Sequence, residues 1–287
     1  MSANTLAIVF KDVFISYGRK ESLAFAAKMH QKLRLKGLDA WFDKVNIPSG
    51  DDYVQRIQAG IRNAHNFIFV MAPHSLTSQN CLDELSYARA LGKRIFPLNH
   101  IQETTAITSL YTKNQQRVRK EIAEILGNRD WLMGREELGN LQELDQWKLG
   151  YENSWKNHQS QEYLKNWVCP IQWKGIDKVE EVIDKFIEVR KADNNYVEEH
   201  TKLLYQALEW ENHHRQTKYL LVGKERQAAE DWLLTEFNQL RLPPCQPTDL
   251  QCEFICEARK NAENLLTDVF ICYDTSNKSI RNAVIRK

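Results

Sequence analysis

The sequence has no long apolar run and no excess of charge of either sign. The apolar segment from Phe67 to Ala72 is far too short to span a lipid bilayer. Basic and acidic residues nearly cancel, with 39 Lys and Arg against 38 Asp and Glu, so the net charge gives no footprint for nucleic acid or an anionic membrane. We therefore expect neither nucleic acid nor a membrane among the partners.

The six cysteines are scattered, and none of them forms a Cys-x-x-Cys pair. Cys252 and Cys256 are four residues apart, but no histidine pair is placed to complete a zinc site. The first residues lack the basic stretch and apolar run of a secretory signal. Scattered thiols without such a signal are typical of the reducing cytoplasm, so we expect a cytoplasmic protein without a bound metal.

What the sequence does contain is a regular alternation of strand and helix signals. Hydrophobic residues make up 43% of the 287 residues, enough for a substantial core. The strand signals are almost continuously apolar, which favours a parallel sheet covered by helices on both faces. Strands are predicted at 13–17, 38–42, 66–71 and 94–98, and helices at 22–36 and 81–91. Another helix is predicted to follow the turn at 48–51, with an apolar stripe made of Val54, Ile57, Ile61 and Ala64.

The rest of the chain divides into three parts. Polar, helical sequence at about 102–165 is interpreted as an insertion, after which a fifth strand at 168–173 and a helix at 177–190 complete a domain spanning residues 1–190. Residues 195–266 are predicted to form a separate, mostly helical module with a short strand at 219–222.

Residues 267–287 contain an internal repeat. Asp268–Tyr273 repeats Asp12–Tyr17, with Cys272 in place of Ser16. We interpret this tail as the start of a second, truncated copy of the first domain and as the front of a longer tandem protein. One strand without its sheet cannot bury its faces, so we expect the tail to be disordered or to add to an exposed sheet edge.

Glu84 is the most informative single residue. It follows the apolar strand at 66–71 and a polar loop, on the first turns of a predicted helix. In an open parallel sheet, this position lies at the crevice outside the carboxyl ends of the strands, where ligands bind. A lone glutamate on a helix is usually solvated, and only the neighbouring motifs make a functional role for Glu84 the better hypothesis.

Three motifs follow one another in the first hundred residues. The first is Asp12–Tyr17 with Gly18-Arg19-Lys20-Glu21, and the second is Ala40-Trp41-Phe42-Asp43 with Ile47–Asp51. The third is Ser75–Leu85, which contains Glu84. In order and spacing, these motifs resemble the conserved regions of TIR (Toll/interleukin-1 receptor) domains. The organisation of the chain is similar to that of bacterial, especially cyanobacterial-type, multidomain TIR proteins. The resemblance implies a flavodoxin-like α/β fold and, for many bacterial and plant members, cleavage of the nicotinamide–ribose bond of NAD+.

The resemblance implies that Glu84 is the catalytic residue, and the chemistry suits a single carboxylate. The nicotinamide of NAD+ is already a pyridinium cation and leaves as a neutral base, so it needs no general acid, in contrast to ordinary glycosidases. A fixed carboxylate stabilises the positive charge that develops on the ribose and can help to deprotonate water. NAD+ is the expected substrate, and no cofactor is expected.

Further roles follow from the same resemblance. Substrate-binding positions lie at or just after the ends of the first two strands and before the Glu84 helix: Ser16, Tyr17, Gly18, Arg19, Trp41, Asp43, Lys44 and Ser78. The BB loop, which in this family gates the site and contacts other TIR domains, comprises Val45, Asn46, Ile47, Pro48, Ser49, Gly50 and Asp51.

Each of these assignments has a purely structural alternative. Tyr17 could pack beneath the loop, Arg19 could be solvated, and Trp41 could belong to the core. Ser78 could serve only as the cap of the Glu84 helix, and Cys81 is better explained as a small buried residue than as a nucleophile. The loop itself could be a flexible connection.

Two departures from the family bear on activity. Many active TIR enzymes have an aromatic residue four positions before the glutamate, where this chain has Asn80, and Tyr53 replaces a frequent Trp. The leading hypothesis is an NAD+ glycohydrolase activated by self-association, acting in bacterial antiphage immunity or signalling, with linear or cyclic ADP-ribose as product. The alternative is a non-catalytic adaptor module that recruits other TIR domains.

Other α/β functions fit less well. A phospho-receiver needs an acceptor aspartate after the third strand, where this chain has Val70-Met71-Ala72. A Rossmann dehydrogenase needs a Gly-x-Gly-x-x-Gly motif after the first strand, and the sequence has none there. The segment Gly223-Lys224-Glu225 lacks the glycine-rich loop of a nucleoside triphosphatase.

Overall fold

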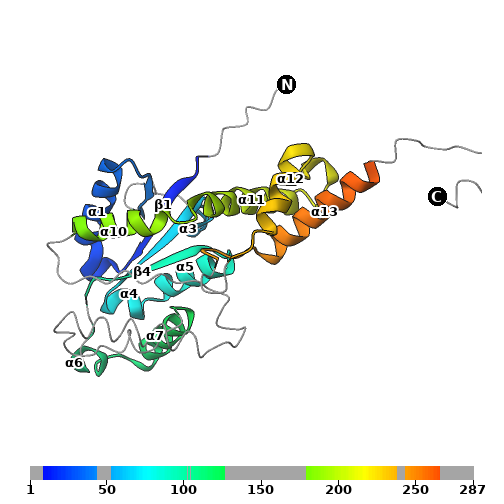
Figure 1. Ribbon diagram of the computed structural model, residues 1–287. Helices are drawn as coiled ribbons and strands as arrows, with labels where there is room; N and C mark the ends of the chain where they lie inside the picture. The colour runs from blue at the N-terminus through cyan, green and yellow to red at the C-terminus, as the bar shows by residue number, and fades with distance from the viewer. Residues whose placement is uncertain are drawn as a thin grey trace, which may run out of the picture.

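The computed structural model describes residues 9–43, 53–101, 103, 105–126, 179–237 and 243–265. Its centre is a parallel sheet with the strand order β2-β1-β3-β4 (Figure 1). The strands are β1 (Lys11–Tyr17), β2 (Ala40–Trp41), β3 (Ala64–Met71) and β4 (Arg94–Asn99). The predicted α/β fold with a parallel sheet is confirmed. The predicted fifth strand at 168–173 lies outside the described residues.

Helices cover both faces of this sheet, because alternate strand residues point to opposite sides. One face packs β1 and β3 residues such as Phe14 and Phe67 against α3 (Tyr53–Arg62), α5 (Gln79–Ala90) and α7 (Lys113–Leu126). The other face packs Val13 and Ile15 against α1 (Arg19–Leu35) and α10 (Val179–Lys191). This two-sided core places the carboxyl ends of β1 and β3 beside the first turns of α1 and α5.

Several details differ from the expectations. Ile57 and Ile61 are buried on α3 as predicted, but Val54 is 60% exposed and Ala64 is the first residue of β3. Val54 lies on the first turn of α3, away from the sheet. The strand predicted at 219–222 is wrong, because Tyr219 ends the 3-10 helix η3 (Thr217–Tyr219) and residues 220–222 form a short connection without regular structure before Gly223.

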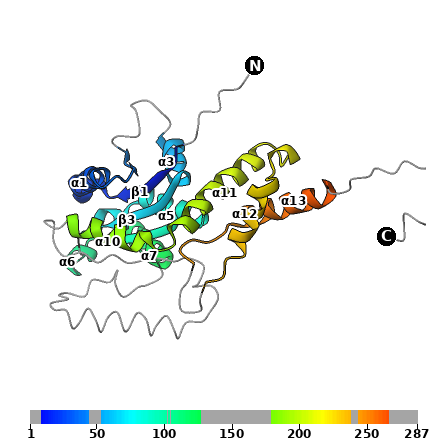
Figure 2. The same cartoon turned by 45° about the horizontal axis from the view of Figure 1, so that its top comes forward.

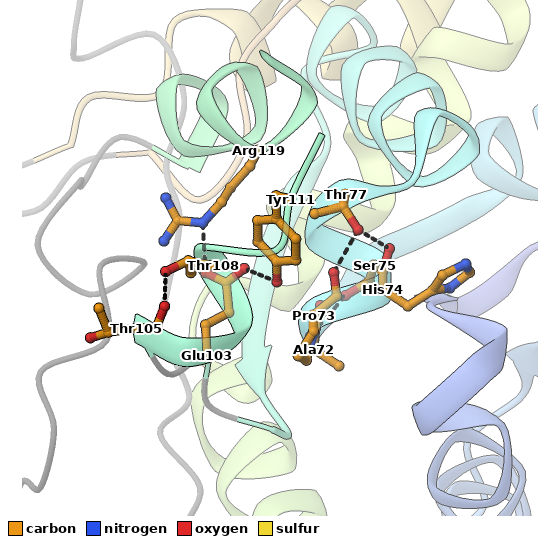
Figure 3. Close-up of polar contacts among 10 residues, drawn as sticks. All are labelled: Ala72, Pro73, His74, Ser75, Thr77, Glu103, Thr105, Thr108, Tyr111 and Arg119. Atoms are coloured by element: carbon orange, nitrogen blue, oxygen red, sulfur yellow. Dashed lines mark hydrogen bonds and ion pairs between the residues drawn. The ribbon is translucent and has the colours of Figure 1, made fainter. Parts of the chain in front are cut away.

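The segment after β4 contributes to the same core as the sheet. After α6 (Thr105–Thr108), helix α7 packs on α4 (Pro73–Thr77) and α5, and its Val118 and Ile122 are fully buried. Glu103 accepts hydrogen bonds from the Tyr111 hydroxyl at 2.7 Å and the Arg119 Nε at 2.6 Å (Figure 3). The remainder of the predicted insertion, from residue 127 to 165, lies outside the described residues.

The C-terminal helices α11 (Asn194–Asn212), α12 (Gly223–Leu233) and α13 (Asp249–Leu265) pack around a core of their own. Figures 1 and 2 show α11 running from the sheet to α12 and α13. Leu204 of α11 belongs to the sheet's core, so the predicted module is joined to the first domain by packing as well as by sequence. No helix in the described ranges is long and apolar enough to cross a membrane. The repeat at 267–287 lies outside the described residues.

Candidate active site

Glu84 lies on α5, where its carboxylate faces the end of β1. Its Oε2 atom accepts a hydrogen bond of 2.6 Å from the Ser16 hydroxyl, and Ser16 is 1% exposed. Helix α5 begins beside this contact because the Ser78 side chain caps it, accepting from the Cys81 N–H at 3.5 Å. The structure therefore brings the predicted residues Ser16 and Glu84 together, and gives Ser78 the capping role.

The surroundings of Glu84 shift its acidity toward neutral. Burial raises the pKa of the Glu84 carboxyl to about 7, and the nearby Asp43 carboxylate acts in the same direction. The hydrogen bond from Ser16 and the positive charge of Arg19 oppose this rise in pKa. Glu84 thus titrates near physiological pH, a range in which catalytic carboxylates are often found.

Asp43 organises the second half of the site. Its Oδ1 accepts a hydrogen bond of 2.6 Å from the Tyr17 hydroxyl, and its Oδ2 forms an ion pair of 2.6 Å with the Arg19 Nη2. The Asp43 side chain is 7% exposed and that of Arg19 is 49% exposed. Burial and the Asp43 carboxylate raise the pKa of the Tyr17 hydroxyl, which keeps it protonated as a donor.

Tyr53 completes this network, although it was not among the predicted site residues. Its hydroxyl accepts a hydrogen bond of 2.8 Å from the Arg19 Nη2, and its ring centroid lies 5.3 Å from the Arg19 guanidinium carbon. Burial raises the pKa of the Tyr53 hydroxyl. The negative charges of Glu84 and Asp43 also raise this pKa, whereas the positive charge of Arg19 opposes the rise. The sequence signal was that Tyr53 stands where the resembling family frequently has a Trp.

Comparison with known proteins identifies a family over the first part of the chain. Residues 13–129 match the family model described as TIR domain. Residues 13–129 belong to the TIR domain family. No curated protein matches the chain significantly.

Two solved structures illustrate what the chain is similar to. The TIR domain of the Toll-related receptor TRR-2 from Hydra magnipapillata is 19% identical, with 40% of this chain and 98% of that chain covered and a TM-score of 0.29. The TIR domains of the activated Roq1 resistosome, which directly recognizes the pathogen effector XopQ, are 11% identical, with 62% and 98% covered and a TM-score of 0.38.

Two other predicted site residues, Trp41 and Gly18, contribute to packing. Trp41 is 7% exposed and stacks on Phe14 with ring centroids 4.4 Å apart, and a Cβ on Gly60 would lie 2.6 Å from its indole. The indole is therefore part of the packed core. Gly18 allows the turn after β1 to approach α4, because a Cβ there would lie 2.6 Å from the Ser75 nitrogen.

Cys81 and Asn80 occupy opposite environments at the start of α5. Cys81 is buried, its thiol donates to the Tyr17 carbonyl at 3.6 Å, and burial raises its pKa to about 12, so it is a poor nucleophile. Asn80 is exposed. Lys44 and the BB-loop residues 45–51 lie outside the described residues.

The site of the TIR domain contains the Glu84 carboxylate, whose pKa is raised to about 7, and the Arg19 guanidinium, which forms an ion pair with Asp43. Among the residues that the structure describes, no group of three or more His, Cys, Asp or Glu side chains could hold a metal ion. Glu84 can stabilise a neighbouring cation or accept a proton. Arg19 can pair with an anion if it exchanges its Asp43 partner.

Proposed function

We propose that the TIR domain is an NAD+ glycohydrolase in which Glu84 is the catalytic residue. The supporting observation is the Glu84 carboxylate, partly buried at the carboxyl end of β1 and held there by the Ser16 hydroxyl at 2.6 Å. Partial burial of a carboxylate costs free energy that a single hydrogen bond offsets only in part, and its position agrees with the ligand crevice of open parallel sheets.

The proposed reaction breaks the bond between the ribose C1′ and the nicotinamide nitrogen. The bonding electron pair moves to the ring nitrogen, which becomes neutral, and positive charge develops on the ribose. The ionised Glu84 stabilises this charge electrostatically at a site already partly shielded from water. Water then adds to C1′ and loses a proton, which Glu84 can accept, and the products are nicotinamide and ADP-ribose.

Arg19 is the proposed contact for the diphosphate. It lies directly after β1, its side chain is half exposed, and its guanidinium can form paired hydrogen bonds with phosphate oxygens. In the structure, the Arg19 guanidinium pairs with Asp43 and Tyr53. Binding of the diphosphate would exchange these partners, so we propose that Arg19 moves when NAD+ enters.

Activity is proposed to depend on assembly between TIR domains and to serve bacterial antiphage immunity or signalling. Depletion of NAD+ would halt an infected cell, and a linear or cyclic ADP-ribose product could act as a signal. These proposals rest on the TIR family of residues 13–129. A steep rise of specific activity with protein concentration is the expected signature, and full activity in dilute monomer would contradict it.

The test is the release of nicotinamide from NAD+ by concentrated purified protein, followed by chromatography, which also separates linear from cyclic ADP-ribose. Glu84→Gln keeps the size of the side chain and is expected to abolish release. Asp83→Asn is the matched control, because it removes the adjacent, exposed carboxylate of α5. Equal release by wild type and Glu84→Gln would reject the proposed role of Glu84.

A second candidate, a non-catalytic adaptor, is favoured by one observation. Asn80 is exposed on the first turn of α5, where active relatives have an aromatic residue that stacks on the substrate. The expected result for an adaptor is self-association without nicotinamide release at any protein concentration.

A further inference from the structure

Ser16 is buried between the sheet and α5. It lies on the same face of β1 as Phe14, because residues two apart in a strand point to the same side. This face packs against α5, and Ser16 retains only 1% exposure there. A buried hydroxyl needs a partner, and Ser16 donates its proton to Glu84.

The bond from Ser16 selects between the two carboxylate oxygens of Glu84. It joins Oγ to Oε2 at 2.6 Å, a length typical of a hydroxyl that donates to a charged carboxylate. Among the residues that the structure describes, Oε1 accepts no hydrogen bond. One oxygen is therefore fixed against the strand, and the other is left for a different partner.

We propose that Ser16 is a positioning residue for Glu84, which holds Oε2 so that Oε1 meets the ribose of NAD+. This inference rests on the proposed function. It differs from the expectation that Ser16 itself binds the substrate, because its hydroxyl proton is already committed and its surface is covered. The hydroxyl also favours the ionised form of Glu84, which is the form that stabilises a developing cation.

The first test compares the pH dependence of nicotinamide release in wild type, Ser16→Ala and Ser22→Ala. Ser22 is the matched control, because it is also fully buried and its hydroxyl contacts another side chain, His100 at 2.9 Å. Ser16→Ala is expected to lower kcat at pH 7 about ten-fold or more and to move the acidic limb to higher pH. KM should change little. A raised KM, with the acidic limb of the pH profile at the same pH as in wild type, would overturn the inference in favour of direct substrate binding by Ser16.

The second test does not need activity. The Glu84 carboxyl carbon, labelled with carbon-13 and assigned by its loss in Glu84→Gln, is titrated by nuclear magnetic resonance. Ser16→Ala should raise the midpoint, and Ser22→Ala should leave it unchanged. Wild type without NAD+ cleavage would reject the proposed function, whereas an unmoved midpoint in Ser16→Ala would reject the positioning role.

A second variant guards against a folding defect. Ser16→Cys is close to serine in size, and cysteine is the residue found at the corresponding position of the repeat, Cys272. A thiol is a weak donor, so the midpoint should again rise. Ser16→Thr restores a hydroxyl and should bring the midpoint back toward the wild-type value. Failure of Ser16→Cys to move the midpoint would also count against the proposal.

Discussion

The Nζ of Lys93 donates to the Thr201 Oγ1 at 3.3 Å, and this contact joins the sheet to the C-terminal helices. The same Nζ donates to the carbonyls of Arg62 and Ala64, each at 2.8 Å. Arg62 is the last residue of α3, and Tyr53, which belongs to the candidate site, is the first. Helix α3 therefore connects the junction with α11 to the neighbourhood of Glu84.

Lys93 is expected to make stability depend on pH. It is 5% exposed, and burial lowers its pKa to about 7. The unfolded chain binds this proton below a pKa of about 10.4, whereas the folded chain binds it only below about 7, so the free energy of unfolding should rise with pH across that interval. The slope has an upper limit of about 1.4 kcal/mol per pH unit.

Urea unfolding of wild type and Lys93→Met at pH 7.5 and 9.5 measures this effect. The pH-dependent gain should be smaller in Lys93→Met than in wild type. Lys120→Met provides the comparison, because the Lys120 side chain is 70% exposed. The same pH dependence in all three proteins would contradict the role of Lys93.

Gly92 is expected to be essential at the same junction. Its φ is +64°, a Cβ there would lie 2.1 Å from the Gln246 carbonyl oxygen, and its own carbonyl accepts from the Gln246 N–H at 3.0 Å. Gly92→Ala should therefore destabilise by more than the roughly 1–2 kcal/mol of left-handed backbone strain. Gly37→Ala isolates that strain, because Gly37 has a φ of +78° and open space around it. The unfolding temperature of Gly92→Ala should be well below that of Gly37→Ala. Equal losses of stability in the two variants would argue against the close contact.

The sequence predicted the parts of the site that depend on local pattern, but not the contacts between them. Ser16 and Glu84 were both named from their motifs, yet their contact depends on α5 packing against the end of β1. Trp41 lies on a strand of two residues, too short for alternation to show whether it faces the core. In the sequence, Lys93 has the pattern of a solvated residue after a helix. Its burial could not be predicted, because α11, which contacts it through Thr201, lies more than a hundred residues further along the chain.

Glu103 is expected to hold α7 in place (Figure 3). Its side chain is 1% exposed and pairs with Arg119 at 2.6 Å, so Glu103→Ala leaves a partly buried cation without this partner. A loss of about 3 kcal/mol in the free energy of unfolding is expected. Glu103→Leu combined with Arg119→Met should lose less than the sum of the single changes, as measured by urea unfolding. Simple additivity would show that the two side chains act independently.

Asp43 is expected to set the pH at which Glu84 works. Its negative charge contributes to the rise of the Glu84 pKa to about 7, so removal of this charge should favour the ionised Glu84. Asp43→Asn keeps an oxygen that can accept from the Tyr17 hydroxyl. Proposed activity should rise with pH through about 7 in wild type and at lower pH in this variant, because the carboxylate is the active form.

The pH profile of nicotinamide release and the carbon-13 titration of Glu84 both measure this shift. Asp39→Asn is the control for removal of a negative charge, since Asp39 is half exposed and pairs with Lys11 at 2.6 Å. It should leave the Glu84 midpoint where it is in wild type. A midpoint that stays fixed or rises in Asp43→Asn would mean that release of Arg19 from its aspartate partner outweighs the lost repulsion, because a guanidinium that moved away from Glu84 would no longer stabilise its charge.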